Sequence, residues 1–509
     1  MIMRLKTGRG RGIPISCVWI AACLLIGVCP RVEGQIVSTT DARKVAQAWI
    51  DITIDREKTW NHSAGAEALE AVEFARGDRL LGYFVPVRPS GYVVVSLRKE
   101  LAPIKAYSET DCLDPTWDQG MADILKSRME GVLDAIENQL GPIGSVRSEN
   151  LAAILDIDYR VSWSEILESS PNAKDYSSGE VMLTTSWYQG EPYDTRCPDL
   201  GCNPSNCLAT TNAPVGCGAT ATSQIMKYWC WPPTEFSGFD WPNMPDDFTG
   251  CAWPQAEIDA VSDLCSDVGV AILSVYGCAG TSSNMLDIRD AYKSGQFTYS
   301  PLCEVEYRVQ HSAQEWWDRI VSELDNNRPI QYGIEDHSIV LDGWQEVGGI
   351  PIRQYHMNYG WDGWVPDASV PWYCPDWAAF GNSNTWYTLD QLPCSDPDNQ
   401  FMCAGIVPAV SIFPELNGDY LAGSLNYRYF AYDSYGQNAV FYGGQNLQFL
   451  PETKVTCTGY GNDRIRFVGS DVSPPDHYLY LFSHGDLSRG MRFYDGAMNV
   501  YGGGTMRVH

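Results

Sequence analysis

A cysteine between two glycines, at the start of a helical pattern, constrains this chain more than any other feature of its sequence. Cys217 lies between Gly216 and Gly218, and small or apolar residues then recur along one face as far as Trp229. This spacing predicts a helix with the cysteine in its first turn. The helix dipole there favours the thiolate, which is the form that attacks a carbonyl carbon. Local sequence alone leaves a half-cystine or a buried core cysteine as alternatives.

A nucleophilic thiolate needs an imidazole, and two of the seven histidines are candidates. His337 directly precedes the apolar run over 338–343, which predicts a strand that would hold the ring in place. His356 lies in a second alternating segment, and each histidine alone is typical of a structural residue. The chemistry that Cys217 requires favours His337 as its partner.

Two further polar residues complete a predicted catalytic set. Asn358 is a natural third member, because its side-chain or backbone oxygen could orient the imidazole. Gln189 can offer its amide to an oxyanion alongside the backbone N–H of Cys217.

The amino terminus predicts an exported protein. Four basic residues precede an apolar run over 13–29, and small residues at Val32 and Gly34 suit cleavage before Gln35. Residues 1–34 are therefore a predicted signal peptide, with an uncleaved anchor as the alternative. No second long apolar segment follows, so we expect a secreted, extracellular chain without a membrane span after cleavage.

Export makes the cysteines candidates for disulfides. Three of the 17 lie in the signal, which leaves 14, most of them between Cys197 and Cys403. In an oxidising compartment most should pair, although spacing does not reveal the partners. Cys197, Cys202 and Cys207 have no histidine nearby, which favours a disulfide-stapled loop over a zinc site. With one nucleophile removed an odd number remains, and we expect Cys112 to be the unpaired cysteine.

Charge and missing motifs exclude several functions. The chain has 35 Lys+Arg against 63 Asp+Glu, a formal net charge of -28, which argues against nucleic-acid or anionic-lipid partners. It has no H-E-x-x-H, Walker or dinucleotide-binding motif, so we expect neither a metal nor a cofactor.

Three units are predicted after the signal. Residues 36–175 suggest a small α+β unit, with a helix capped by Asp41, a hairpin of strands over 80–87 and 92–97, and a helix through 121–136. Residues 168–180 are typical of an exposed, cleavable linker. Residues 181–409 hold most of the cysteines. Residues 410–509 contain short β-type runs, which predict an all-β accessory or surface-attachment module.

Four segments, in order along the chain, resemble the streptopain family of secreted bacterial cysteine peptidases. They are Gln189–Tyr193, Gly216–Tyr228, His337–Gly343 and Asn358–Gly363. The resemblance implies an α+β, papain-like two-lobed peptidase domain. It implies Cys217 as nucleophile, His337 as general base and acid, and Gln189 in the oxyanion hole. It also implies that Asn358 and Trp361 position the histidine.

The resemblance extends to both sides of the nucleophile segment. Residues 91–96 and 102–104 are similar to the family's inhibitory prosegment, which implies a zymogen whose own prosegment blocks the site. The segment around Ser282 is similar to a substrate-binding loop. Asp336 replaces the family's usual glycine before the histidine. A carboxylate there would favour the imidazolium and line the substrate side.

Two other functions remain open for such a chain, whose expected partners are protein or peptide substrates. A transamidase or amide hydrolase on the same scaffold would share the Cys-His-Asn chemistry and differ in its acceptor. A surface adhesin could retain an inactive peptidase fold, which the intact set of Gln189, Cys217, His337 and Asn358 argues against.

Overall fold

The computed structural model describes most of the chain between residues 36 and 408. The described ranges are 36–118, 120–168, 176–179, 181–205, 207–232, 234–248, 251–300, 303–360, 384–389 and 400–408, with the backbone of five short strands between 421 and 468. The expected signal peptide, Trp361 and most of residues 410–509 lie outside these ranges.

The described residues contain helices and a mainly antiparallel sheet, which confirms the expected α+β class. The helices are α1 (Thr39–Glu57), α2 (Gly120–Leu140), α3 (Ser148–Ala152), α4 (Arg160–Glu168), α5 (Cys217–Trp229), α6 (Thr234–Ser237), α7 (Gln255–Ala271), α8 (Met285–Lys293) and α9 (Ala313–Asp325). The strands up to residue 178 are β1 (Glu67–Ala68), β2 (Val72–Arg76), β3 (Arg79–Arg88), β4 (Tyr92–Ser96), β5 (Ile104–Ser108) and β6 (Tyr176–Ser178). The later ones are β7 (Glu304–Tyr307), β8 (Ile330–Ile334), β9 (His337–Val347), β10 (Ile352–Asn358), β11 (Thr385–Thr388) and β12 (Phe401–Ala404).

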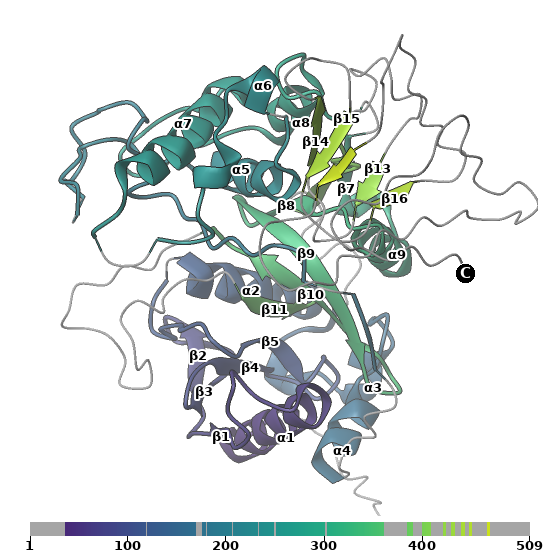
Figure 1. The fold of residues 1–509 in the computed structure, drawn as a ribbon. Helices are drawn as coiled ribbons and strands as arrows, with labels where there is room; N and C mark the ends of the chain where they lie inside the picture. The colour runs from purple at the N-terminus through teal and green to yellow at the C-terminus, as the bar shows by residue number, and fades with distance from the viewer. Residues whose placement is uncertain are drawn as a thin grey trace, which may run out of the picture.

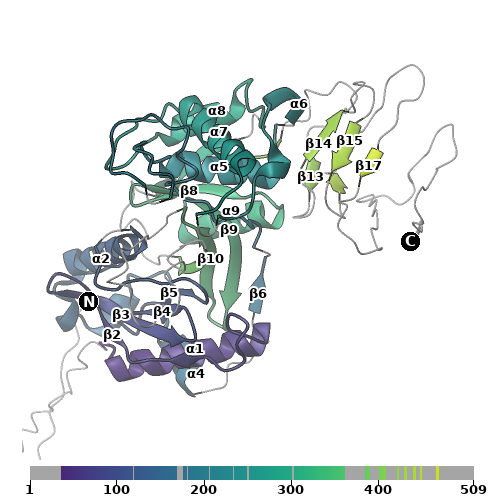
Figure 2. The ribbon, with the colours of Figure 1, turned by 60° about the vertical axis from the view of Figure 1, so that its left-hand side comes forward.

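The amino-terminal unit, residues 36–168, forms around the predicted hairpin of β3 and β4. Figures 1 and 2 show these strands between α1 and α2. Helix α1 begins at Thr39, and the hydroxyl of Ser38 accepts a hydrogen bond from the backbone N–H of Asp41 at 3.1 Å. The expectation that Asp41 caps this helix is therefore wrong, because Ser38 satisfies the first turn. Trp49, on the buried face of α1, is fully buried.

One sheet runs through both the amino-terminal unit and the second unit, residues 176–408. Its strand order is β1-β3-β4-β5-β11-β10-β9-β8-β12-β7, with β2 paired to β3 and β6 paired to β9 (Figure 1). The units meet where β5 pairs with β11, with Tyr107 opposite Trp386 and Ala106 opposite Tyr387. Backbone pairing between segments this far apart makes the two units one continuous sheet.

Side chains reinforce this junction. The hydroxyls of Tyr92 and Thr385 are 3.0 Å apart, and the Gln345 amide donates to the hydroxyl of Tyr107 at 2.9 Å. Arg128 of α2 forms an ion pair with Glu335, at 2.8 Å, in the turn between β8 and β9. The two units are therefore joined by hydrogen bonds and an ion pair between side chains as well as by backbone pairing.

A buried chain of hydrogen bonds also crosses the junction. The carboxylate of Asp111 accepts from the backbone N–H of Asn384 at 2.9 Å, and the Asn384 side chain lies 2.9 Å from Nε2 of His356. Nδ1 of His356 is 2.6 Å from Asp342. Burial raises the pKa of Asp111 to about 7, despite hydrogen bonds from Asn384 and Thr110. Burial alone would lower the pKa of His356, but the charge of Asp342 outweighs it and raises that pKa.

This network predicts that the junction weakens as pH rises. Asp111 is neutral in the folded protein below about pH 7 and must carry a buried charge above it, whereas its ordinary pKa is 3.8. The cost grows between these two values and reaches about 4 kcal/mol above the higher one. The stabilisation from protonated His356 is complete below its ordinary pKa of 6.5 and is lost as pH rises through its raised folded value. Both groups therefore act in the same direction.

We expect the thermal midpoint of the full chain to fall between pH 5 and 8, and Asp111→Asn to flatten that fall. Differential scanning fluorimetry of the two proteins measures this, with the exposed Asp78 as a control position for Asp78→Asn. Equal slopes for Asp111→Asn and the unsubstituted chain would show that Asp111 does not titrate in this range.

The sequence predicts a linker over 168–180 and an all-β module over 410–509. Within the linker, β6 pairs with β9, with Tyr176 opposite Val347, so this part is bound to the sheet and not a loose connection. In the carboxy-terminal region the described backbone forms β13 (Leu421–Gly423), β14 (Tyr429–Tyr432), β15 (Ala439–Tyr442), β16 (Leu447–Phe449) and β17 (Arg466–Val468). These strands lie within the segment 410–509, which is predicted to contain short β-type runs.

The described cysteines divide into bonded and unbonded groups. Cys202 is bonded to Cys278 and Cys207 to Cys251. Cys112 is buried and disulfide-bonded, so the expectation that it is unpaired is wrong; the parity of the count showed that a cysteine is left over, but not which one. Six described cysteines are outside disulfides. In the part of the chain described here, no helix has the length and apolar character needed to cross a membrane.

Candidate active site

The nucleophile position is built by a glycine turn leading into α5. Gly216 has a φ of 91°, which favours glycine, and Cys217 follows as the first residue of the helix. A Cβ at Gly216 would lie 2.7 Å from the carbonyl oxygen of Thr281, and one at Gly218 would collide with the hydroxyl of Ser283. The two glycines therefore let another loop pack directly on the turn. Cys217 is half-buried at the positive end of the helix.

His337 reaches Cys217 from a tight turn between β8 and β9. Glu335 and Asp336 form the turn with φ of 47° and 58°, and Ile334 pairs with His337 across the hairpin. His337 is hydrogen-bonded to Cys217, so the structure brings together this cysteine and this histidine. His356, the other candidate, is instead buried against Asp342.

The electrostatic interaction and hydrogen bond between these two side chains shift the pKa values of both. Burial alone would raise the pKa of the Cys217 thiol, but the charge and hydrogen bond of His337, with the backbone N–H groups of Ser338 and Gly218, outweigh it and lower that pKa. Burial alone would lower the pKa of His337, but Cys217 and the Tyr359 carbonyl raise it. These shifts favour a thiolate–imidazolium pair.

A backbone carbonyl orients the imidazole. Nε2 of His337 lies 2.8 Å from the carbonyl oxygen of Tyr359, and the Tyr359 ring stacks on the imidazole at 15° between planes. A carbonyl oxygen only accepts, so Nε2 carries a proton and Nδ1 is left for the thiol.

Asn358 holds this carbonyl in place indirectly. Its amide donates to the carbonyl of Thr185 at 2.6 Å and to Gln224 at 3.1 Å, and its oxygen accepts from the backbone N–H of Gly360 at 3.3 Å. Within the described residues, its side chain makes no hydrogen bond to His337. Gln224, on the buried face of α5, thus links the nucleophile helix to the turn that carries Tyr359.

Gln331 is a second residue that links α5 to the sheet, and no sequence motif predicts it. Its amide donates to the carbonyl of Gly218 at 3.0 Å and to the hydroxyl of Ser338 at 3.0 Å, and its oxygen accepts from Thr222 at 2.9 Å. It is fully buried. It therefore sets the spacing between the start of α5 and the start of β9. No motif surrounds it, so only the tertiary structure reveals it.

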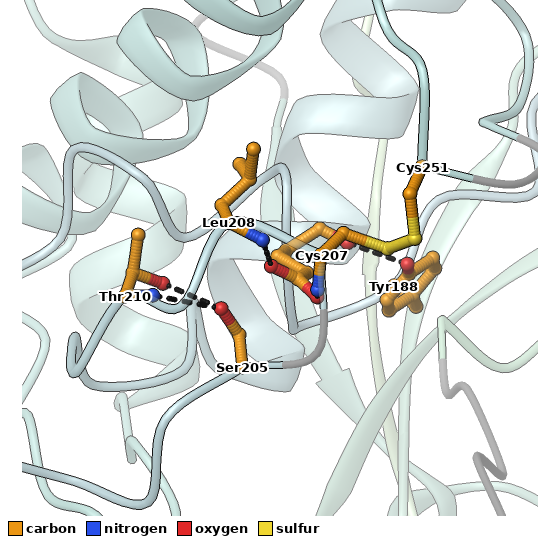
Figure 3. The surroundings of a disulfide bond; sticks show 7 residues. Tyr188, Ser205, Cys207, Leu208, Thr210 and Cys251 are labelled. Atoms are coloured by element: carbon orange, nitrogen blue, oxygen red, sulfur yellow. Dashed lines mark hydrogen bonds between the residues drawn. A yellow bond between two sulfur atoms is a disulfide. The ribbon is translucent and has the colours of Figure 1, made fainter.

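Gln189 lies on the other side of the nucleophile turn. Its carbonyl accepts from the backbone N–H of Val215 at 2.8 Å, two residues before Cys217. The next turn is held by Glu191, whose carboxylate accepts from the backbone N–H of Leu208 at 2.7 Å and from that of Cys207. Figure 3 shows Leu208 beside the Cys207–Cys251 disulfide.

The remaining predicted site residues lie at the edges of this arrangement. Ser282 is exposed and pairs by its backbone with Val275, next to the Thr281 that packs on Gly216. Asp336 is exposed in the turn before His337. Trp361 is outside the described residues, and so is any contact it makes. Among the residues that the structure places, no group of three or more His, Cys, Asp or Glu side chains is arranged to hold a metal ion.

Comparison with known proteins finds a family model that matches the central segment. Residues 187–367 match the model of the Peptidase C10 family. The chain is 25% identical over 371 residues to the thiol protease/hemagglutinin PrtT of Porphyromonas gingivalis, covering 67% of this chain but only 39% of that protein. It is 24% identical over 341 residues to streptopain of Streptococcus pyogenes, covering 59% of this chain and 77% of streptopain.

A solved structure is also similar. Prointerpain A of Prevotella intermedia superposes with a TM-score of 0.46 at 19% identity, covering 67% of this chain and 98% of that fragment.

Proposed function

We propose that the chain is a secreted cysteine endopeptidase made as a zymogen, a proposal that the match of residues 187–367 to the Peptidase C10 family model supports. Its substrates are peptide bonds in proteins. The observation that carries the proposal is the hydrogen-bonded pair of Cys217 and His337, with the thiol pKa lowered and the imidazole pKa raised.

The chemistry follows from this pair. The Cys217 thiolate attacks the scissile carbonyl carbon, and the proton on Nδ1 of His337 passes to the leaving amine. The backbone N–H of Cys217 and the amide of Gln189 stabilise the oxyanion. Water then attacks the thioester carbonyl carbon and gives a proton to Nδ1 of His337, the Cys217 thiolate leaves as the carboxylic acid product forms, and the thiolate–imidazolium pair is restored. Asn358 acts as a positioning residue through the turn that bears the Tyr359 carbonyl, and Trp361 remains the second residue proposed to position the histidine.

The amino-terminal unit is the proposed intramolecular inhibitor. The pairing of β5 with β11 supports this, because it fastens residues 36–168 to the sheet that carries His337. The ion pair of Arg128 with Glu335, two residues before His337, supports it as well. Cleavage between about residues 168 and 180 releases the unit, and β5 must separate from β11 for this to be complete. The carboxy-terminal strands form a proposed surface-attachment module.

Incubation of the purified full chain with a thiol reductant tests the proposal. We expect a smaller form to appear, casein to be hydrolysed, and an epoxide active-site probe to label Cys217 in the processed form. Incorporation of an amine probe without peptide cleavage would instead indicate a transamidase. A chain that does not process itself, and that reacts with neither probe nor substrate after an added peptidase has removed the amino-terminal unit, would indicate an inactive adhesin.

A further inference from the structure

One disulfide bond joins two loops that lie far apart in the sequence. Cys202 belongs to the cysteine-rich loop that follows Tyr193, and Cys278 lies in the loop between α7 and α8. The two are disulfide-bonded across a sequence separation of 76 residues. The bond joins a structural loop to the segment over 275–283, which we call the wall loop.

The wall loop packs against the nucleophile turn. Val275 and Ser282 exchange backbone hydrogen bonds of 2.8 and 3.1 Å, which close the loop at its base. The hydroxyl of Thr281 donates to the carbonyl of Pro214 at 2.6 Å, and Thr281 also occupies the space beside Gly216. The position of this base relative to Cys217 is thus set by direct contacts.

The tip of the wall loop lacks comparable packing. Cys278, Ala279 and Gly280 are exposed, and a Cβ at Gly280 would meet nothing within 4 Å. Small exposed residues bury little apolar surface, so they lose much conformational freedom when ordered and gain little in return. The disulfide is the covalent restraint at this tip.

The other end of the bond is well anchored. The backbone N–H of Cys202 donates to the carbonyl of Thr211 at 2.9 Å. The Asn212 amide donates to the carbonyls of Asp194 and Thr195 at 3.0 and 2.9 Å. The disulfide therefore ties the exposed tip of the wall loop to a loop that is held by hydrogen bonds of its own.

We propose that the Cys202–Cys278 disulfide is a positioning element of the substrate site, and that its reduction weakens peptide binding while leaving Cys217 competent. This rests on the proposed peptidase function. The disulfide restricts the wall loop to the conformation that borders the cleaved peptide. Without it, substrate binding must pay for ordering the tip.

The proposal implies that two groups in one site need opposite oxidation states. Cys217 must be reduced to attack, whereas the Cys202–Cys278 bond must remain oxidised. Two molecules of a small thiol convert the disulfide to two cysteine thiols and are themselves oxidised to one disulfide, so atoms and electrons balance. Because Cys278 is exposed, this exchange is accessible. Peptidase activity should rise and then decline as thiol concentration increases.

The test compares the full chain with its Cys202→Ser/Cys278→Ser variant after removal of the amino-terminal unit by immobilised unsubstituted enzyme. Epoxide titration counts the competent active sites. We expect KM for a casein peptide to rise roughly tenfold in the variant while kcat per titrated site changes less than about twofold. Cys230→Ser, at the far end of α5, is the matched control and should keep the original KM.

A reductant titration of the unsubstituted enzyme gives a second measurement that does not depend on a variant folding. We expect KM to rise over the thiol range in which peptide mapping shows Cys202 and Cys278 become alkylatable. An unchanged KM across that range, or in the double variant, would overturn the inference although casein is still cleaved. If no form of the chain cleaves casein, the proposed function itself fails, and with it the inference.

Discussion

Cys217→Ala is expected to leave the full chain uncut and to lower casein hydrolysis by at least about a thousandfold, the largest effect that we predict for any substitution. The thiolate is the atom that forms the bond to the substrate, and no other described cysteine is hydrogen-bonded to His337. Mass spectrometry of the incubated chain measures self-processing, and fluorescent casein measures turnover.

Cys230→Ala is the control for this experiment, because it removes a cysteine from the other end of the same helix. It should process itself and hydrolyse casein as the unsubstituted chain does. If the Cys217→Ala chain still matures in a preparation free of other peptidases, Cys217 is not the nucleophile and the proposed function is wrong.

His337→Ala is expected to have the second-largest effect, and to act on the thiol as well as on the proton transfer. The imidazolium offsets the cost of burying the thiolate. Without it, burial should move the pKa of Cys217 above its ordinary value of 9.0. Alkylation by iodoacetamide at pH 6 should then slow by at least about a hundredfold, and casein turnover should fall by about a thousandfold.

The sign of the pH dependence follows from the same pair. In the unsubstituted enzyme, activity should rise as pH increases through the lowered pKa of Cys217 and fall as pH increases through the raised pKa of His337. In His337→Ala the alkylation rate should only rise, with its midpoint displaced to higher pH. Both proteins are first processed by immobilised unsubstituted enzyme.

His311→Ala is the matched histidine control, since His311 lies near Glu306 and away from the catalytic pair. It should leave the alkylation curve unchanged. Rapid alkylation of His337→Ala at pH 6 would mean that the end of helix α5 alone sustains the thiolate, and His337 would lose its proposed role.

The structure also changes how the histidine is understood to be oriented. Asn358 was expected to orient the imidazole, but the carbonyl of Tyr359 makes the contact and Asn358 fixes that carbonyl through Thr185 and Gln224. A backbone carbonyl is present at every residue, so no sequence pattern marks the one that is used. Gln224 lies within a motif that the sequence showed, whereas Gln331 lies in none, although each ties α5 to a different part of the sheet.

Local elements were predictable because their signals are local. The period of apolar residues located α5 and α2, and the two strand-like runs over 80–87 and 92–97 located the hairpin of β3 and β4. The N-cap of α1 is Ser38, three residues before the predicted Asp41. Both are good capping residues, and only the geometry distinguishes them.

The sequence by itself determined that a glycine-flanked cysteine would begin a helix, that a histidine would begin a strand, and that the chain resembles one peptidase family. These follow from residue type and short-range spacing. Only the tertiary structure decided that β5 pairs with β11, that Cys202 bonds to Cys278 and that Cys112 is not the unpaired cysteine. Such choices join segments tens to hundreds of residues apart. They depend on which surfaces meet when the whole sheet is assembled, and no local pattern carries that information.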